Sequence, residues 1–307
     1  MFKNKVTIIG AGMVGSTTAF SLISARLVEE LALIDINKEL NRSQVMDLQH
    51  SIPFLGYTKV KIGSYNDLND SRLVIITCGV SQKNGETRLD LLKRNSVIIK
   101  KLLPEIFRRN PKIIVIIVTN PVDILTNLAV KMFPRHKAQI FGSGTILDSA
   151  RFRFLLGEKI SVNPNSLHAY IIGEHGDSEV PLWSTVTVGN TRLDKFWQLS
   201  SREKDIIFNN ARNAAYAIIA GKRATYYAIA AGVAQLAEAV LYNKKTVFTV
   251  SHPVDGKFGL KDVSLSLPVV IGGKGVLRGI NIEVSAGERK LLLRSAKQLK
   301  QAEKGLK

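Results

Sequence analysis

The sequence predicts an α/β protein with a doubly wound parallel sheet in its first half and an α+β arrangement in its second half. Short β-branched runs alternate with longer helical patterns from residue 5 to residue 120. Those runs are apolar on both faces, which is typical of parallel strands covered by helices on both sides. A glycine-rich turn directly follows the first run, as a doubly wound nucleotide-binding fold requires.

The elements of the first half follow in regular order. We expect strands at 5–10, 31–35, 72–79 and 112–120, separated by helices that end near residue 25, pass through 44–50 and cover 91–107. From about residue 143 the pattern changes, because helical stretches at 148–156 and 201–240 flank antiparallel-type strands at 246–254 and 263–272. We therefore predict two closely packed domains, 1–142 and 143–307, with a cleft between them.

Composition restricts the class of protein. The 307 residues are 45% hydrophobic and carry a formal charge of +18, with basic residues scattered along the chain rather than clustered, which argues against nucleic acid as the main partner. A single cysteine, Cys78, suits a reducing compartment, so we expect a cytoplasmic protein. No uninterrupted apolar run reaches the roughly 18 residues of a membrane span, and the apolar segment 224–241 is expected to be a core helix.

The glycine turn carries the first functional signal. Gly10, Gly12 and Gly15 follow the first strand in a GxGxxG pattern, and Asp35 ends the second strand twenty residues after Gly15. This spacing is typical of a Rossmann domain, in which the glycines admit a pyrophosphate and the acid binds a ribose hydroxyl pair. A carboxylate there favours NAD over NADP. The alternative is a purely structural turn with Asp35 as a helix cap.

A second cluster of polar residues suits proton transfer. Asp148 and Arg151 stand one helical turn apart, and His175 follows in "GEHGDSE". A carboxylate fixes the tautomer of an imidazole and favours its charged form, while arginine offers a fork for a substrate carboxylate. Each residue also has a structural interpretation, as a cap, a surface charge or a turn residue.

Six motifs occur in order over nearly the whole chain, namely "GAGMVG", "GETRLDLLKRN", "VTNPVD", "LDSARFR", "GEHGDSE" and "ATYYAIA". Together they closely resemble the bacterial L-lactate dehydrogenases of the lactate/malate dehydrogenase family. The resemblance implies NAD-dependent interconversion of pyruvate and L-lactate by a Rossmann NAD-binding domain at 1–142 and a catalytic domain at 143–307. It also implies a homotetramer without a metal.

The resemblance assigns roles to individual residues. His175 matches the proton donor and acceptor, Asp148 its orienting partner, and Arg151 the clamp on the substrate carboxylate. Arg88 matches a catalytic arginine that closes over the substrate and stabilises charge on the carbonyl oxygen. Further matches are Asn120, Thr225 and Ile229 in substrate binding, and Gly10, Gly12, Met13, Val14, Gly15, Asp35, Thr77, Gly79 and Asn120 in cofactor binding.

The segment "CGVSQKNGETR" bears on substrate choice. It carries Gln82 where malate enzymes of the family usually have an arginine, and Gly79 and Gly85 give it the freedom of a closing loop. A buried second carboxylate without a cation would cost several kcal/mol. Glutamine therefore favours a methyl-sized group such as that of pyruvate, although Lys83 keeps a cation nearby.

Arg153 and His168 stand where allosteric bacterial lactate dehydrogenases bind fructose 1,6-bisphosphate, which makes this metabolite the expected activator. The alternative is a surface arginine and a structural histidine. Two other functions remain open. One is a malate or other 2-hydroxyacid dehydrogenase, and the other is a non-catalytic nucleotide- or RNA-binding protein, supported only by the net charge.

Overall fold

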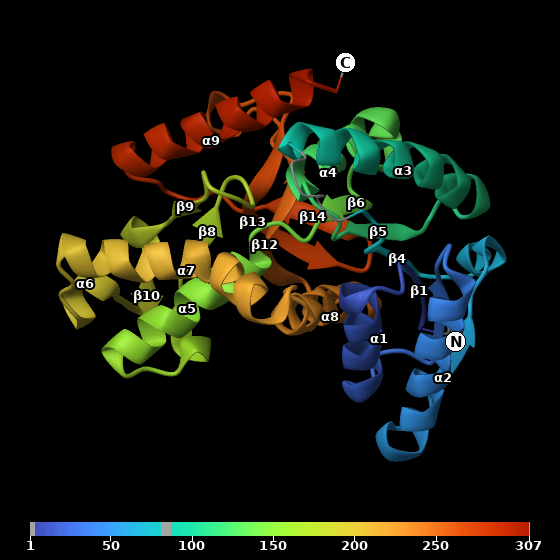
Figure 1. Cartoon of the computed structure of the whole chain (residues 1–307). Helices are drawn as coiled ribbons and strands as arrows, with labels where there is room; N and C mark the ends of the chain where they lie inside the picture. Colours follow the sequence, from blue (N-terminus) through green and yellow to red (C-terminus); the bar gives the residue numbers. More distant parts are fainter. Residues whose placement is uncertain (1–3, 81–86, 307) are drawn as a thin grey trace.

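The computed structural model describes residues 4–80 and 87–306 (Figure 1). Across these residues, the largest sheet has nine strands in the order β14-β13-β12-β6-β5-β4-β1-β2-β3. Its parallel part comprises β1 (Lys5–Ile9), β2 (Glu30–Ile34), β3 (Lys59–Ile62), β4 (Leu73–Ile76), β5 (Ile114–Ile117) and β6 (Ile140–Gly142). Within that part the order 3-2-1-4-5-6 is that of a doubly wound dinucleotide-binding fold, so the predicted fold class is confirmed.

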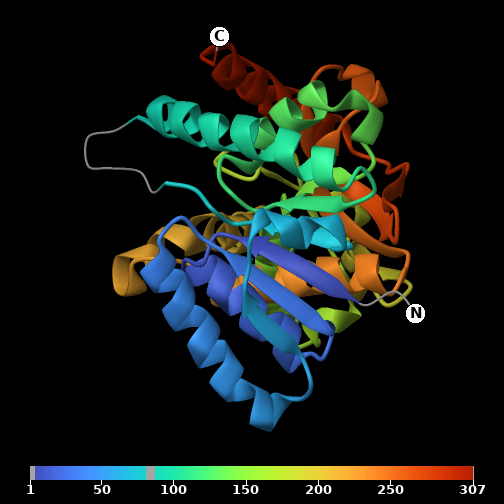
Figure 2. The ribbon, with the colours of Figure 1, turned by 90° about the vertical axis from the view of Figure 1, so that its right-hand side faces the viewer.

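Helices cover both faces of the parallel strands, as the apolar runs require. α1 (Met13–Ser24) and α2 (Lys38–Leu55) lie on one face, and α3 (Arg88–Arg109) and α4 (Val122–Met132) lie on the other (Figure 2). Alternate strand residues feed the two cores: Ile8 packs in the core under α1 and α2, while Ile9 packs in the core under α3 and α4.

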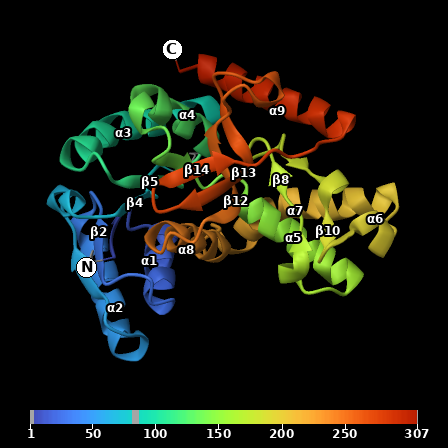
Figure 3. The same cartoon turned by 180° about the vertical axis from the view of Figure 1, so that it is seen from behind.

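The strands expected at 246–254 and 263–272 are β12 (Thr246–Pro253) and β13 (Ser264–Gly272), and they pair antiparallel. They extend the parallel sheet, because Ser251 of β12 pairs with Gly142 of β6. β14 (Gly275–Gly279) completes this end of the sheet, which is seen from behind in Figure 3. One continuous sheet therefore runs across the predicted domain boundary.

The rest of the second half packs beside this sheet. α5 (Ile146–Ile160) contacts α7 (Ser201–Lys222), and α8 (Tyr227–Leu241) packs on α1 as the expected core helix. The helical stretch expected at 201–240 is divided, because Arg223 adopts a left-handed conformation after α7 and residues 223–226 are not helical. The remaining elements are α6 (Leu193–Phe196), α9 (Ala286–Lys304), β7 (Leu167–His168), β8 (Ile171–Ile172), β9 (Val180–Pro181), β10 (Thr187–Val188), β11 (Thr191–Arg192) and the short 3₁₀ turns η1 (Tyr65–Asn69), η2 (Pro134–His136), η3 (Pro164–Ser166), η4 (Trp183–Thr185) and η5 (Lys257–Gly259).

Over residues 4–80 and 87–306, no helix combines the length and apolar content needed to cross a bilayer.

Candidate active site

The glycine turn joins β1 to α1. Gly10 has a φ of +115°, and a Cβ added there would lie 2.4 Å from the backbone nitrogen of Cys78. A Cβ added at Gly15 would lie 1.8 Å from the Gly10 carbonyl oxygen, whereas one at Gly12 would meet nothing within 4 Å. Gly10 and Gly15 are therefore required by the protein's own packing. Gly12 leaves open space at the amino end of the helix, where a ligand can approach the protein backbone closely.

Asp35 lies at the same edge of the sheet. The backbone nitrogen of Ala11 donates a 2.6 Å hydrogen bond to its Oδ2, which ties the end of β2 to the glycine turn. The carboxylate remains partly exposed, and no side chain caps the amino end of α1 at Gly12. Uncapped helix amides beside a partly exposed carboxylate fit the pyrophosphate and ribose of a dinucleotide.

Of the other predicted cofactor residues, Met13 and Val14 open α1, while Thr77, Gly79 and Asn120 follow the carboxyl ends of β4 and β5. The Thr77 hydroxyl donates to the Gly10 carbonyl at 2.9 Å, and a Cβ at Gly79 would lie 2.6 Å from Thr119 Cγ2. Asn120 follows β5, and its carbonyl accepts a 2.8 Å hydrogen bond from Asn95. These strand ends lie where the strand order reverses, which is the usual ligand site of such folds.

Asp148 joins the two other groups of the predicted proton-transfer cluster. His175, on the loop 173–179 between β8 and β9, has its Nδ1 2.5 Å from Asp148 Oδ2. Arg151 Nη1 donates to Asp148 Oδ1 at 3.1 Å. The side chains of Asp148, Arg151 and His175 are 3%, 13% and 25% exposed, so the shared carboxylate is buried while the imidazole and guanidinium still reach the surface of a cavity.

The charges of this cluster reinforce one another. Burial opposes the charged imidazole of His175, but Asp148 outweighs it and raises the histidine pKa to about 9, with Asp123 adding to the effect. Burial likewise opposes the Asp148 carboxylate, while His175 and Arg151 hold its pKa below the usual value. The pair therefore favours a proton on the imidazole and none on Asp148.

Two buried carboxyl groups near His175 were not predicted. Asp123, in α4, accepts a 2.7 Å hydrogen bond from the His175 backbone nitrogen, and burial raises its pKa to about 6. Glu179 ends the histidine loop and is 6% exposed. Both stand inside quoted motifs, "VTNPVD" and "GEHGDSE", but nothing local distinguishes a buried acid from the exposed acid that a loop usually carries.

A cavity of about 500 Å³ opens onto the proton-transfer cluster. Asn120, Asp148, Arg151 and His175 all line it, together with apolar residues of α3 and with side chains of α7. The structure thus brings together four of the predicted residues. Among the remaining lining residues are Leu89, Leu92, Pro121, Ile124, Glu179, Arg212 and Tyr216.

Four other predicted substrate residues are not among the described residues that line this cavity. Thr225 lies in the link between α7 and α8, and Ile229 packs against the core under α1, so neither is among the described lining residues. Arg88 is the first residue of α3, after the capping residue Thr87, but its side chain lies outside the described part of the chain. Gln82 lies outside the described residues altogether. Their roles stay predictions.

The predicted regulatory residues share a smaller cavity of about 210 Å³. Arg153 of α5 and His168 of β7 both line it, and Arg153 Nη1 donates to the Ala169 carbonyl at 3.3 Å. Burial lowers the Arg153 pKa. His168 is exposed.

Cys78 behaves as a small, partly buried hydrophobe. Its side chain packs against the core under α3 and α4. Burial, with a smaller contribution from Asp35, raises the thiol pKa to about 12, so the nucleophilic thiolate is disfavoured at neutral pH.

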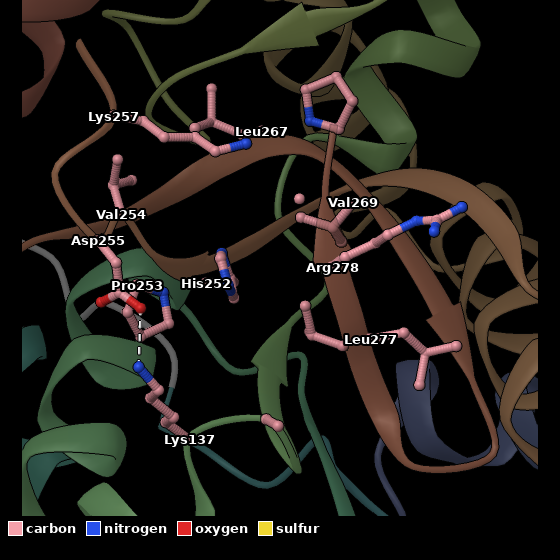
Figure 4. A pocket seen from close by; sticks show the side chains of 14 residues that line it. Lys137, His252, Pro253, Val254, Asp255, Lys257, Leu267, Val269, Leu277 and Arg278 are labelled. Atoms are coloured by element: carbon pink, nitrogen blue, oxygen red, sulfur yellow. Dashed lines mark hydrogen bonds and ion pairs between the residues drawn. The ribbon is translucent and has the colours of Figure 1, made fainter. Parts of the chain in front are cut away.

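A separate cavity of about 290 Å³ lies between β12, β13 and β14 (Figure 4). Lys137 pairs with Asp255 at 2.8 Å at its edge, and Lys257 donates to the Ile280 carbonyl at 2.9 Å. Burial lowers the pKa of His252 to about 4, so this imidazole is neutral. The predicted site residues do not line it, and it is distinct from the site around His175.

The fold and the site define a dinucleotide-dependent enzyme with a buried histidine–aspartate–arginine centre. Residues 4–142 match the model of the lactate/malate dehydrogenase NAD binding domain, and residues 145–307 match that of the lactate/malate dehydrogenase alpha/beta C-terminal domain. The chain belongs to the lactate/malate dehydrogenase family. The predicted family and the predicted cofactor, NAD, are thereby confirmed.

The relatives agree in fold and length. The L-lactate dehydrogenase of Acetivibrio thermocellus is 44% identical over an alignment of 311 positions, gaps included, which covers 98% of this chain and 97% of the relative. That of a Synechococcus strain is 44% identical, with 97% of each chain covered. Among solved structures, a lactate dehydrogenase from a deep-sea metagenome of the Medee basin has a TM-score of 0.96 at 36% identity, covering 100% of this chain and 99% of its own. The minor L-lactate dehydrogenase of Enterococcus mundtii has a TM-score of 0.95 at 34% identity, with the same coverage.

Proposed function

We propose that the protein is an NAD-dependent L-lactate dehydrogenase that catalyses the reversible reduction of pyruvate to L-lactate. The observation that carries this proposal is the position of Asp148, which contacts both the proton-carrying His175 and the carboxylate-binding Arg151 at one cavity. A single buried carboxylate thus fixes the distance between a proton donor and an anion clamp. A 2-oxo acid presents a carbonyl oxygen and a carboxylate on adjacent carbons, one for each of these groups.

The residues act in a defined order. Arg151 binds the substrate carboxylate through charge-assisted hydrogen bonds. Asp148 occupies Nδ1 of His175, so Nε2 is the nitrogen that gives a proton to the carbonyl oxygen in reduction and removes it from the hydroxyl in oxidation. Arg88 is proposed to complete the site by stabilising the developing negative charge, and closure of its loop to exclude water.

NAD fits the edge of the sheet formed by the glycine turn and Asp35. When bound, it supplies the hydride that the protein itself cannot provide. Gly12 leaves space for the pyrophosphate, and Asp35 is placed to bind the ribose hydroxyls. We propose that Met13, Val14, Gly10, Gly15, Thr77, Gly79 and Asn120 complete the cofactor site.

Substitution of His175 tests the catalytic assignment. His175→Ala should lower kcat by at least about 100-fold, since general acid catalysis contributes about 10²–10⁴-fold, while NADH affinity stays within about threefold of wild type. Fluorescence titration of NADH and steady-state turnover measure the two quantities on the same preparation. Loss of NADH binding together with turnover would show that His175 is structural and would contradict the assignment.

The regulatory proposal rests on the cavity shared by Arg153 and His168. We propose that it binds fructose 1,6-bisphosphate, because a cationic guanidinium and an exposed imidazole at one cavity suit phosphate groups. The resemblance to the family supports a second proposal, that the active assembly is a homotetramer. Pyruvate saturation at pH 7 with and without the bisphosphate is the direct check. Wild-type saturation curves that coincide with and without the bisphosphate would contradict the proposal. So would a bisphosphate-induced shift that is equally large in wild type and in Arg153→Gln.

The division of the chain and its location are also proposals. The change of pattern at residue 143 supports an NAD-binding domain at 1–142 and a catalytic domain at 143–307, although the sheet continues through the Gly142–Ser251 pair. The single cysteine supports a cytoplasmic location.

A further inference from the structure

Glu179 is a buried acid in the site that the proposed mechanism does not use. It ends the loop that carries His175 and lines the same cavity as Asp148 and Arg151, yet it is only 6% exposed. Its Oε1 has no hydrogen-bond partner among the described residues. A carboxylate in that position would be costly, because its Oε1 has lost water without gaining a hydrogen bond that would compensate a buried charge.

Charged groups approach Glu179 from three elements. Asp148 repels a negative charge on it, while Arg151, His175 and Arg212 attract one. α9 and the residue that caps its end add only the uncharged Gln301, Ala302 and Gly305 to the described lining. The titratable groups at this part of the cavity are Asp148 and Arg151 from α5, Arg212 and Tyr216 from α7, and Glu174, His175 and Asp177 from the loop; Asp123 of α4 contacts the His175 backbone.

The balance of these interactions favours the neutral acid at physiological pH. Burial is the largest effect and Asp148 adds to it, so the Glu179 pKa rises to about 9 despite the three cations. Glu179 and His175 therefore lose their protons in the same range and titrate as an interacting pair.

We propose that Glu179 is a positioning residue that works as a neutral acid. When it carries its proton, it does not compete with the substrate carboxylate for the Arg151 guanidinium; when it has lost the proton, it becomes a competing anion in the same cavity. This inference rests on the proposed function, because it needs Arg151 to bind an anionic substrate. It assigns to the site a second proton besides that of His175, and both must be present when pyruvate binds.

The number of protons can be counted from the pH dependence of kcat/KM, which reports ionisations of the free enzyme. Pyruvate reduction is measured at saturating NADH between pH 6.5 and 10.5 for wild type, Glu179→Gln and Glu174→Gln. Glutamine copies the shape of the neutral acid and cannot ionise. Glu174 is the matched control, because it lines the same cavity but already accepts a hydrogen bond from the Ser178 hydroxyl.

Two lost protons predict that log(kcat/KM) for wild type falls with a slope approaching about −2 above pH 9.5, and that Glu179→Gln, whose amide cannot ionise, falls with a slope of about −1. Glu174→Gln should keep the wild-type slope. A wild-type slope of −1, or equal slopes in wild type and Glu179→Gln, would overturn the inference, and the wild-type slope decides even if Glu179→Gln fails to fold. A wild type that reduces no pyruvate at any pH would instead reject the proposed function.

Discussion

Replacing Asp148 with asparagine should separate proton supply from the shape of the site. Asparagine has nearly the same volume, so the packing around its 3% exposed side chain is retained while the charge is lost. The Asp148 carboxylate is the main group that raises the His175 pKa to about 9, against the opposing effect of burial. Without it we expect the histidine pKa to fall to its ordinary value of 6.5 or lower.

The expected size of the effect follows from the fraction of protonated imidazole. At pH 7.5 that fraction is about 97% for a pKa of 9 and at most about 9% for a pKa of 6.5, which is roughly a tenfold loss. Pyruvate reduction needs the protonated form, so its kcat/KM should fall at least about tenfold at this pH, and further where the asparagine amide selects the wrong tautomer. Lactate oxidation needs the neutral form, so the protonation effect there has the opposite sign.

The assay follows NADH absorbance in both directions from pH 5.5 to 10. Wild-type pyruvate reduction should be constant at low pH and decline as the pH rises through about 9. In Asp148→Asn the decline should begin at least two pH units lower. An unchanged midpoint, or an equal loss in both directions at pH 7.5, would refute the assigned coupling between Asp148 and His175.

Three further predictions concern other parts of the structure. Gly12→Ala should leave the melting temperature unchanged, because its Cβ meets no protein atom, but should weaken NADH binding at least tenfold in a titration. Gly15→Ala should lower the melting temperature of the free protein, because its Cβ clashes with the Gly10 backbone. Lys5→Ala should destabilise the fold by about 3 kcal/mol in urea unfolding, since it removes the buried cation and leaves Glu30 and Asp67 with only the more exposed Lys61, and Lys61→Ala should destabilise it by clearly less. Arg151→Lys should reduce kcat/KM for pyruvate by about 10- to 150-fold through loss of one charge-assisted hydrogen bond; unchanged kcat/KM would show that Arg151 does not bind the carboxylate.

The parallel half of the fold could be predicted because its signals are local. Buried parallel strands read as apolar runs, and the glycine turn must stand between the first strand and its helix. The contact between Asp148 and Arg151 is equally local, because a spacing of three residues places both on one helix face. The continuity of the sheet was not predictable, since the pair Ser251–Gly142 depends on contacts between distant segments.

The site could be predicted only partly. His175 and Asp148 are 27 residues apart in sequence, and their pairing came from the family resemblance rather than from spacing. Asp123 approaches the His175 backbone from 52 residues away, and Glu179 is buried only because α5 and α7 close over it. Neither an acid at the start of a helix nor one in a polar loop has a local feature that marks it as buried, so these two carboxyl groups are recognised only in the tertiary structure.

The substrate assignment is tested most directly by NADH oxidation with pyruvate and with oxaloacetate, measured side by side on wild type and on Gln82→Arg. Wild type should have the higher kcat/KM for pyruvate and form L-lactate, and Gln82→Arg should shift the preference toward oxaloacetate by providing a cation for the second carboxylate. A wild type that prefers oxaloacetate, or that oxidises NADH with neither acid, would contradict the proposed function.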